Sequence, residues 1–397
     1  MLMRNDHDGS QRLAPQDGVM VNHDQARRRS LRTFHPDESP WQLREDAQHA
    51  GGALIDLASN DYLGLSRHPA LVNAATAALH QDGVGAGGSR LVTGSRPCHA
   101  RLEQALANWL GRERVLLFPS GFQANLAAVQ ALADRHSTVL ADRLIHHSLL
   151  IGIRACGARL QRFAHNDLSD LEQRLQKLRR ADSRSVLVIT ESLFSMEGTS
   201  PDLEVMAALC SGYGARLLVD EAHALGVLGT EGRGLCHGLK NPVHLISGTF
   251  GKAFGSGGAF LAGDAVMGDR LLQTSGAFRY TTALAPPLVA GATAALDLIK
   301  NHPDWGMVLQ QRSAQWRRSL LEKGWQCPDG TGPILPLLIG SDQEALDCQH
   351  QLERAGLLCM AIRPPTVPEG TARLRLVLRR DLPDDTLNRL IEALPSR

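Results

Sequence analysis

Short apolar runs alternate with amphipathic stretches through the middle of the chain. Each run is four to six residues long and is followed by polar or glycine-rich residues, the pattern of a buried strand that ends in a turn. Segments such as ANLAAVQALA, between the runs, have helical spacing. This alternation predicts an α/β fold whose large, mostly parallel sheet carries helices on both faces. The runs are RVLLF (114–118), STVLA (137–141), SVLVIT (185–190), ARLLVD (215–220) and HLIS (244–247).

The two ends of the chain have a different pattern. HDQARRRSLRTF, residues 23–34, predicts a short basic helix. After about residue 300, long helical stretches alternate with short strands, and ARLRLVL (372–378) has the period of a half-exposed strand. We expect the C-terminal region, with the N-terminal segment, to form a smaller α+β domain. The expected divisions are a polar tail at 1–22, an N-terminal segment at 23–54, a large cofactor-binding domain at 55–300 and a small domain at 301–397.

Composition excludes several classes of function. The 397 residues have a formal net charge of +1 and 4% aromatics, which argues against nucleic-acid or anionic-membrane binding. The seven cysteines include no CxxC pair, so we expect neither a disulfide framework nor a metal site. The first twenty residues lack the apolar core of a secretory signal, and no apolar run approaches the roughly 20 residues of a membrane span. We expect a cytoplasmic protein.

Polar residues follow several of these strands, where open α/β sheets bind ligands. Gly121 of PSGFQAN begins a helix after RVLLF, and a helix N-terminus there suits a phosphate, although an ordinary turn is the alternative. Asp220 ends ARLLVD, and a carboxylate at a buried position needs a cation or strong hydrogen bonds. His223 follows three residues later. A structural salt bridge is the alternative for Asp220, and His146 and Ser195 taken singly fit structural roles equally well.

One glycine-rich stretch, SGTFGKAFGSGGAF (247–260), contains Lys252. A phosphate-binding loop requires GxxxxGK followed by Ser or Thr, but Ser247 replaces the first glycine and Ala253 follows the lysine. A formal GxGxxG match at 83–88 follows a helical stretch and not a strand, so a dinucleotide site is excluded. A lysine combined with a buried aspartate, a histidine and an anion site suits pyridoxal phosphate, whose aldehyde bonds to lysine and whose ring nitrogen takes an acidic partner.

Eight motifs occur in order along the chain, and together they resemble those of the α-oxoamine synthases, which are fold-type I pyridoxal-phosphate transferases. Within that family, IRPPTVP is most similar to the 8-amino-7-oxononanoate synthases. The likeness runs from about residue 24 to the C-terminus. The motifs are SNDYLGLSRHP, GSRLVTGS, FPSGFQAN, ADRLIHHSLL, ESLFSMEG, VDEAHALGVLG, GTFGKAFG and AIRPPTVPEGTARLRL.

The resemblance implies a reaction, a cofactor and an assembly. The reaction is the decarboxylative condensation of L-alanine with pimeloyl-CoA or pimeloyl-carrier protein. It gives 8-amino-7-oxononanoate, CO2 and free thiol in biotin biosynthesis, with pyridoxal 5'-phosphate as cofactor. The acyltransferase is implied to be a homodimer with shared active sites. The alternative is another α-oxoamine synthase, such as glycine C-acetyltransferase (2-amino-3-ketobutyrate CoA ligase). A non-catalytic paralogue is disfavoured because no expected catalytic position is substituted.

The resemblance also implies roles for individual residues. Lys252 bonds to the cofactor and moves the α-proton, and Asp220 pairs with the ring nitrogen. His146 stacks on the ring and contacts substrate. His223 and Ser195 contact the phenolic oxygen or the substrate. The remaining implied cofactor contacts are Gly121 and Phe122 at a helix start, Thr249 on the phosphate, and Thr281 and Thr282 on the partner's phosphate.

The implied substrate-binding residues fall into two groups. Arg375 and Asn60 would hold the amino-acid carboxylate, since a bidentate arginine suits that group. Arg373 lies two residues before Arg375, and a solvated face is its alternative. The acyl substrate would be served by Arg32, Arg363 and Thr366.

Overall fold

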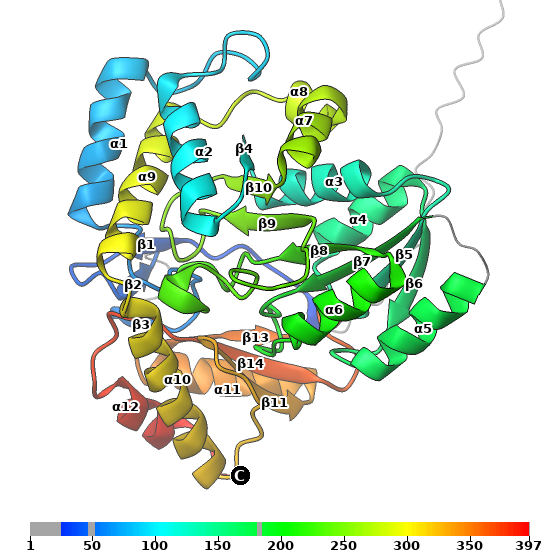
Figure 1. The fold of residues 1–397 in the computed structure, drawn as a ribbon. Helices are drawn as coiled ribbons and strands as arrows, with labels where there is room; N and C mark the ends of the chain where they lie inside the picture. The colour runs from blue at the N-terminus through cyan, green and yellow to red at the C-terminus, as the bar shows by residue number, and fades with distance from the viewer. Residues whose placement is uncertain (1–24, 47–51, 181–184, 397) are drawn as a thin grey trace, which may run out of the picture.

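A seven-stranded sheet forms the centre of the computed structural model, which describes residues 25–46, 52–180 and 185–396 (Figure 1). Its strand order is β4-β10-β9-β8-β7-β5-β6, and β10 is antiparallel to both of its neighbours while the other pairs are parallel. The predicted mostly parallel sheet is therefore confirmed. The strands are β4 (Arg114–Phe118), β5 (Thr138–Asp142), β6 (Arg159–Phe163), β7 (Val186–Glu191), β8 (Arg216–Asp220), β9 (Leu245–Thr249) and β10 (Ala259–Gly263).

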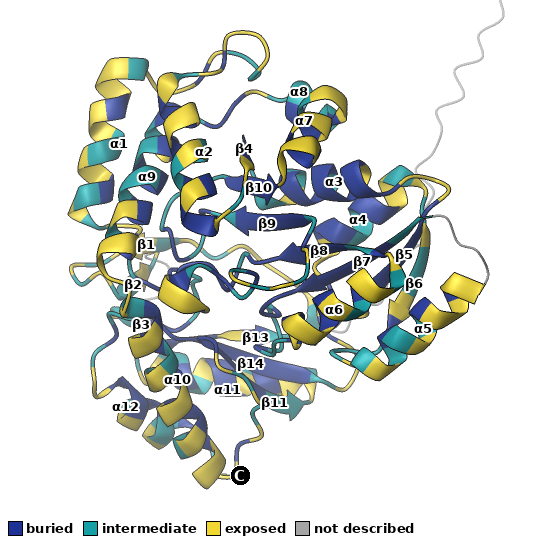
Figure 2. Ribbon diagram, in the orientation of Figure 1, coloured by how far each residue is buried: buried dark blue, intermediate teal, exposed yellow. Residues whose placement is uncertain are grey.

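Helices cover both faces of this sheet, as predicted. Successive side chains of a strand point to opposite faces, so Leu116 and Phe118 of β4 enter one core while Val115 and Leu117 enter the other. Figure 2 shows the central strands buried between helices with exposed outer surfaces. One face carries α3 (Gly121–Leu132), α4 (His147–Cys156), α7 (Ala265–Thr274) and α8 (Gly276–Arg279). The other carries α2 (Pro97–Leu110), α5 (Leu168–Arg180), α6 (Leu203–Tyr213) and α9 (Pro286–Asn301), with α1 (Pro69–Asp82) packed on α9.

Two smaller sheets lie beside the large one. An antiparallel sheet has the order β11-β14-β13, and a second sheet, β1-β2-β3-β12, joins the N-terminal segment to the C-terminal region through the parallel pair β3 and β12. The predicted boundary at residue 55 falls inside β3, and the division into domains stays a prediction. The elements are β1 (Phe34–Pro36), β2 (Gln42–Glu45), β3 (Leu54–Asp56), α10 (Trp305–Glu322), β11 (Ile334–Gly340), α11 (Asp342–Arg354), β12 (Leu357–Leu358), β13 (Met360–Ile362), β14 (Ala372–Val377) and α12 (Thr386–Ala393).

Two local predictions are wrong. The basic helix expected at 23–34 is, from residue 25 onward, a single 3-10 turn at Gln25–Arg27 followed by extended chain into β1. The strand β14 is not half exposed, because all six of its residues are buried. Its arginines pack against the large sheet instead of facing solvent. The polar tail predicted at 1–22 lies outside the described residues.

Other sequence expectations concern cysteines, metals and membranes. All seven cysteines are free thiols. In the described part of the chain, no group of three or more His, Cys, Asp or Glu side chains is arranged to hold a metal ion. None of the helices described combines the length and the apolar character needed to cross a membrane.

Candidate active site

A cavity of about 220 Å³ lies where β7, β8 and β9 end. It brings together seven of the residues predicted from the sequence, from four separate segments of the chain. These are Gly121, Phe122, His146, Asp220, His223, Thr249 and Lys252. The cavity also contains Asn125, Ser148 and Glu191, to which the sequence assigned no role.

Lys252 enters this cavity from the loop between β9 and β10. Backbone hydrogen bonds from Gly255 N to Lys252 O (2.9 Å) and from Ser256 N to Phe250 O (2.8 Å) close the loop into a tight turn. Its amine makes no hydrogen bond or ion pair with any residue that the structure describes. Burial lowers the pKa of Lys252, and the carboxyl groups of Asp220 and Glu191 partly oppose that effect. A lowered pKa favours the neutral amine, which is the nucleophilic form.

Asp220 is the last residue of β8, and its carboxylate is held by neutral donors. Oδ2 accepts a hydrogen bond from Asn125 Nδ2 at 2.7 Å, and Oδ1 accepts one from Ala222 N at 2.9 Å. Among the described residues no cation pairs with Asp220, so the alternative of a structural salt bridge does not hold. Asn125 belongs to α3 and also donates to Ser148 Oγ at 2.9 Å.

Glu191 ends β7 and stands opposite Asp220 in the parallel β7–β8 register. It is buried, and its Oε1 atom has no hydrogen-bond partner. Burial and the neighbouring charge of Asp220 raise the pKa of Glu191 well above its ordinary value. The sequence carries the same signal for Glu191 as for Asp220, because each carboxylic acid comes at the end of an apolar run.

His223 is connected to the predicted carboxylate clamp through a tyrosine that the sequence analysis did not select. Its Nδ1 lies 2.5 Å from the hydroxyl of Tyr62, which also contacts Asn60 Oδ1 at 3.3 Å. The same amide oxygen accepts a hydrogen bond from Arg375 Nη2 at 2.9 Å, so the predicted Asn60–Arg375 contact is present. Burial, together with the charges of Lys252 and Arg375, lowers the pKa of His223 well below its ordinary value. His223 is therefore neutral at pH 7.

The start of α3 and the N-cap of α4 form the rest of the cavity wall. Ser120 caps α3, and its side chain accepts a hydrogen bond from Gln123 N at 3.3 Å. Gly121 follows at the first helical position, where its free N–H group and the helix dipole favour an anion. His146 caps α4, with its Nδ1 2.7 Å from Ser148 Oγ. Burial lowers the pKa of His146, so its ring is neutral at pH 7.

His146 also lines a second cavity, of about 600 Å³. Ser195 lies in this second cavity and not in the Lys252 cavity, and its backbone oxygen accepts a hydrogen bond from Arg375 Nε at 2.6 Å. Thr366 also lines the second cavity. Arg143 and Arg162 line it as well, and both guanidinium groups are exposed without a side-chain partner among the described residues.

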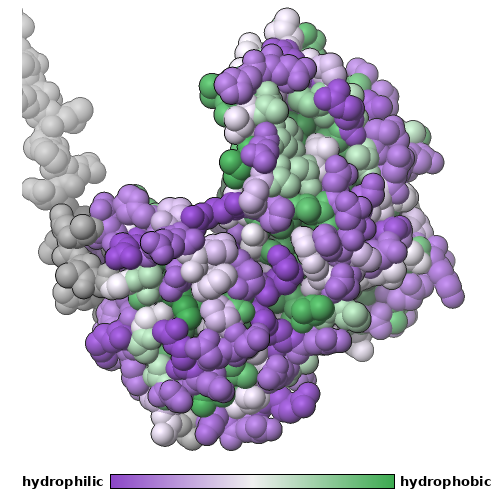
Figure 3. All heavy atoms as spheres, turned by 90° about the vertical axis from the view of Figure 1, so that its left-hand side faces the viewer, coloured by the Kyte–Doolittle hydropathy of each residue, from purple (hydrophilic) through white to green (hydrophobic). Residues whose placement is uncertain are grey.

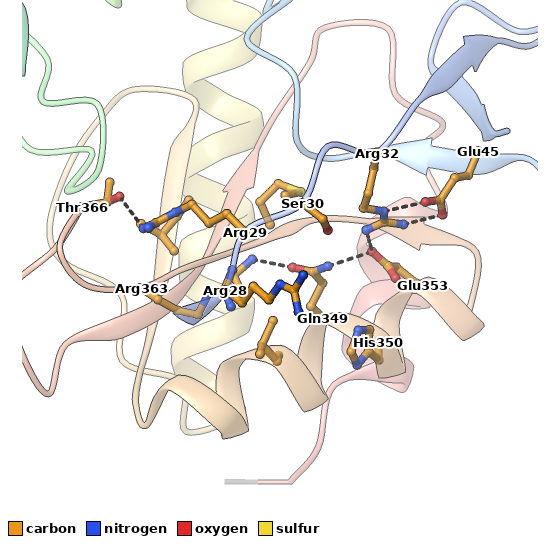
Figure 4. Close-up of a pocket in the computed structure, with 14 residues that line it drawn as sticks. Arg28, Arg29, Ser30, Arg32, Glu45, Gln349, His350, Glu353, Arg363 and Thr366 are labelled. Atoms are coloured by element: carbon orange, nitrogen blue, oxygen red, sulfur yellow. Dashed lines mark hydrogen bonds and ion pairs between the residues drawn. The ribbon is translucent and has the colours of Figure 1, made fainter. Parts of the chain in front are cut away.

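Thr366 is shared with a third cavity, of about 580 Å³, which is shown in Figure 4. Arg363 and Arg32 line this cavity, as the predicted acyl site requires, but Arg32 is ion-paired with both Glu45 and Glu353 at 2.6 Å. Its charge is therefore neutralised within the chain. Arg29, which was not predicted, donates to Thr366 Oγ1 at 3.2 Å.

Thr281 and Thr282 do not reach the Lys252 cavity of their own chain. They line a separate hollow of about 460 Å³, together with Leu91, Val92 and Tyr280. Thr282 pairs with Ser89 in an isolated bridge, and Thr281 Oγ1 accepts a hydrogen bond from Gln123 Nε2 at 3.2 Å.

Comparisons with known proteins agree with this geometry. The family model for aminotransferase class I and II matches residues 53–394. The chain is 41% identical over 374 residues to an 8-amino-7-oxononanoate synthase of Chromohalobacter salexigens, covering 89% of this chain and 96% of that one. It is 42% identical to the 8-amino-7-oxononanoate synthase of Klebsiella pneumoniae, covering 93% and 94% of the two chains.

The chain is also similar in fold to several solved structures. A serine palmitoyltransferase of Sphingomonas wittichii matches with a TM-score of 0.85 and 29% identity, covering 91% of this chain and 90% of that one. An 8-amino-7-oxononanoate synthase of Francisella tularensis matches with a TM-score of 0.74 and 27% identity, covering 86% and 96% of the two chains. A further serine palmitoyltransferase structure, with 27% identity, a TM-score of 0.86 and coverage of 91% and 92%, holds a pyridoxal-phosphate internal aldimine.

Proposed function

The chain belongs to the 8-amino-7-oxononanoate synthase family, and from that membership we propose that it condenses L-alanine with a pimeloyl thioester. The family consists of pyridoxal-phosphate-dependent acyltransferases and places the enzyme in biotin biosynthesis. The products are 8-amino-7-oxononanoate, CO2 and the free thiol. The observation that carries the proposal is the convergence of Lys252, Asp220 and His223 on one cavity beside the Asn60–Arg375 pair.

The residues of the Lys252 cavity fit pyridoxal phosphate. The buried Oε1 of Glu191 has no hydrogen-bond partner among the described residues, and Lys252 lines the same cavity, as expected where a polar group binds. Gly121 at the start of α3 leaves room, since a Cβ built there would lie 3.9 Å from Thr249. The α3 N-terminus and Thr249 would hold the phosphate, Lys252 the aldehyde carbon, and Asp220 the ring nitrogen.

When bound, the cofactor supplies an electron sink for negative charge at the α-carbon of an amino acid. The hydrogen bonds from Asn125 and Ala222 orient the Asp220 carboxylate for this purpose. Lys252, whose pKa is lowered by burial, removes the α-proton at its Nζ atom in its neutral form. His223 has its Nδ1 occupied by Tyr62, so we assign its Nε2 to the cofactor's phenolic oxygen or to the substrate.

The two substrates would approach from different sides. Arg375 and Asn60 would bind the carboxylate of L-alanine, because Arg375 is a buried cation whose Nη2 already contacts Asn60. The thioester would enter through the second cavity, past Thr366 and towards His146. Arg143 and Arg162 supply positive charge suited to the phosphate groups of a thiol carrier. Arg363, Arg29 and Thr366 line the third cavity and would also serve the acyl substrate. We assign Arg32 a structural role because of its two ion pairs.

We also propose a homodimer that completes each active site. Figure 3 shows apolar side chains gathered in a hollow on the face that carries α1. Exposed apolar residues in and after α1, on α9 and beside Thr281 include Val84, Leu91, Val92, Tyr280 and Leu288. A soluble monomer seldom exposes so many large apolar groups in neighbouring segments. A partner seated on them would receive Thr281 and Thr282 at its own cofactor phosphate.

The test is the visible absorption spectrum of the cofactor-loaded protein before and after L-alanine, with glycine as the control. We expect a lysine-dependent band that responds to alanine, followed by formation of 8-amino-7-oxononanoate when a pimeloyl thioester is added. The Lys252→Ala variant should neither turn over nor retain the cofactor after borohydride reduction. A response to glycine alone, with turnover of acetyl-CoA, would move the assignment to glycine C-acetyltransferase. The absence of any band would refute the proposed chemistry.

A further inference from the structure

Two arginines of β14 hold successive carbonyl groups of one loop at the edge of the large sheet. Arg375 Nε donates to Ser195 O at 2.6 Å, and Arg373 Nη1 donates to Met196 O at 3.1 Å. The two arginines share a face because side chains alternate along a strand. Since β14 is the middle strand of its sheet, between β11 and β13, both arginines project from a well-supported backbone.

Glu197 completes the contact. Arg373 Nη1 lies 3.2 Å from Glu197 Oε1, and the two side chains are only 6% and 13% exposed. Burial raises the pKa of Glu197 and lowers that of Arg373, and each charge partly offsets the effect of burial on the other. Thr371 fixes the guanidinium further by accepting two hydrogen bonds. Arg373 Nε donates to Thr371 O at 3.0 Å, and Arg373 Nη2 donates to Thr371 Oγ1 at 3.2 Å. Arg373 is therefore an oriented, buried cation and not the solvated residue that the sequence allowed.

The loop is also anchored at its base. Phe194 N donates to Thr199 O and Gly198 N donates to Phe194 O, both at 2.9 Å. Gly198 has a φ of +67° and packs so closely on β11 that a Cβ built on it would lie 2.2 Å from Ile334 O. The apex, Ser195 to Glu197, projects beyond this base and is held by the arginines of β14.

This apex separates the two proposed substrate sites. On one side, Ser195, Met196 and Glu197 line the second cavity together with His146 and Thr366. On the other side, Arg375 binds both the apex and Asn60 of the proposed carboxylate clamp. A shift of the apex against β14 therefore changes the separation between the amino-acid clamp and the acyl-donor cavity.

We infer that Arg373, paired with Glu197, is a positioning residue that keeps the acyl-donor cavity in register with the amino-acid clamp. The inference rests on the proposed function, because it takes the two substrates to occupy these two sites. Arg373 touches neither substrate and acts through the carbonyl of Met196 and the carboxylate of Glu197. Condensation requires two reacting carbons to meet, so a displacement of about 1 Å at the apex is enough to lower the rate.

The test compares Arg373→Gln, Glu197→Gln and the double variant with the wild type. In Arg373→Gln we expect the KM for the thioester to rise about tenfold or more and kcat to fall. The dissociation constant of L-alanine, measured from the absorption spectrum, should change less than about threefold, because Arg375 and Asn60 remain in place. The fold-loss in kcat/KM for the thioester should be smaller in the double variant than the product of the two single fold-losses, because the two residues act as one unit. Arg373→Lys, which keeps the charge, should recover part of the loss.

Arg312→Gln serves as the matched control. Arg312 also bridges two elements, with hydrogen bonds to the carbonyls of Arg379, Arg380 and Leu382 and an ion pair with Asp384, but it lines neither substrate cavity. If Arg373→Gln lowers the melting temperature as Arg312→Gln does and leaves the thioester KM unchanged, Arg373 is merely structural and the inference is overturned. Multiplicative losses in the double variant would overturn it as well. If Arg373→Gln does not fold, Glu197→Gln carries the test, with the same expected rise in thioester KM. Failure of the proposed function would already appear in the wild type as a missing response to alanine.

Discussion

The hydroxyl of Tyr62 lies 2.5 Å from Nδ1 of His223, and both residues are buried. Burial raises the pKa of Tyr62 and lowers that of His223. At neutral pH, Tyr62 is therefore a phenol and His223 is a neutral imidazole. The phenol has one proton, and its contact with Nδ1 is much shorter than its 3.3 Å contact with Asn60 Oδ1, so we assign that proton to Nδ1. The proton of the imidazole then lies on Nε2, the nitrogen available to the cavity. Tyr62 thus selects the tautomer in which His223 is a donor.

Removing that hydroxyl should weaken catalysis more than folding. In Tyr62→Phe we expect a loss of about 1 kcal/mol in unfolding free energy, the net worth of one hydrogen bond. We expect kcat to fall roughly tenfold, because His223 is no longer held in one tautomer. Nitrogen NMR of the histidine ring would report the tautomer directly. An unchanged kcat together with an unchanged tautomer would contradict this role for Tyr62.

The Asn125–Asp220 hydrogen bond leads to a second prediction. Asp220→Asn should still bind pyridoxal phosphate but should lose turnover by roughly 100-fold or more, because a neutral amide cannot keep the ring nitrogen protonated. Cofactor retention on a desalting column and kcat with L-alanine measure the two effects separately. Asn125→Ala keeps the carboxylate but removes one of its donors, so its loss should be smaller. Near-normal turnover in Asp220→Asn would rule out the electrostatic role.

Glu221 predicts how stability depends on pH. Its side chain is buried and accepts hydrogen bonds from Leu235 N and Cys236 N at 2.6 and 3.1 Å, while Oε2 has no partner. Burial raises the pKa of Glu221 to about 7 from an ordinary value of 4.5. The folded state therefore binds more protons than the unfolded state between pH 4.5 and 7, and stability from this group falls as pH rises through that window.

Above pH 7, the unfolding free energy that Glu221 contributes has fallen by about 3 kcal/mol, at about 1.36 kcal/mol for each pKa unit. Glu221→Gln keeps an acceptor for both backbone donors and removes the titration. We expect the difference in unfolding free energy, Glu221→Gln minus wild type, to be more positive at pH 8 than at pH 5. Urea unfolding of both proteins at the two pH values measures this difference. An equal stability difference at both pH values would show that Glu221 does not titrate in this range.

The proposed dimer is testable at its exposed apolar residues. Val92 and Tyr280 are 77% and 81% exposed in the single chain, and both flank the hollow that contains Thr281 and Thr282. Val92→Glu or Tyr280→Glu should shift the protein towards monomer in analytical ultracentrifugation and weaken cofactor binding, because a buried charge opposes association. Val266→Glu is the control, since Val266 is equally exposed at 77% but lies on α7, away from this hollow. A monomeric wild type with full activity would refute the shared site.

Much of the fold was predictable because its signals are local. The five predicted strands correspond to β4, β5, β7, β8 and β9 with ends shifted by no more than two residues. Two strands of the large sheet were missed: β6 is an edge strand, RLQRF, with few buried residues, and β10 lies in a glycine-rich stretch. The β6 strand lacks the apolar run that marks a buried strand. The β10 strand does contain a short run, AFLA, but the glycines on both sides of it obscured the signal.

The sequence by itself determined the residue types at the strand ends, and with them Lys252, Asp220 and His223 as candidates. Chain topology then required these strand ends to share one edge of the sheet. The tertiary structure alone decided which partners those residues have. Asn125 and Tyr62 acquire their roles from contacts across 95 and 161 residues of chain. Glu191 acquires its role from Asp220 on the neighbouring strand, and Arg373 is buried by a loop 176 residues away. The alternation in ARLRLVL shows only that the arginines share a face. Whether that face meets water or a carboxylate depends on packing between distant segments, which the local pattern does not encode.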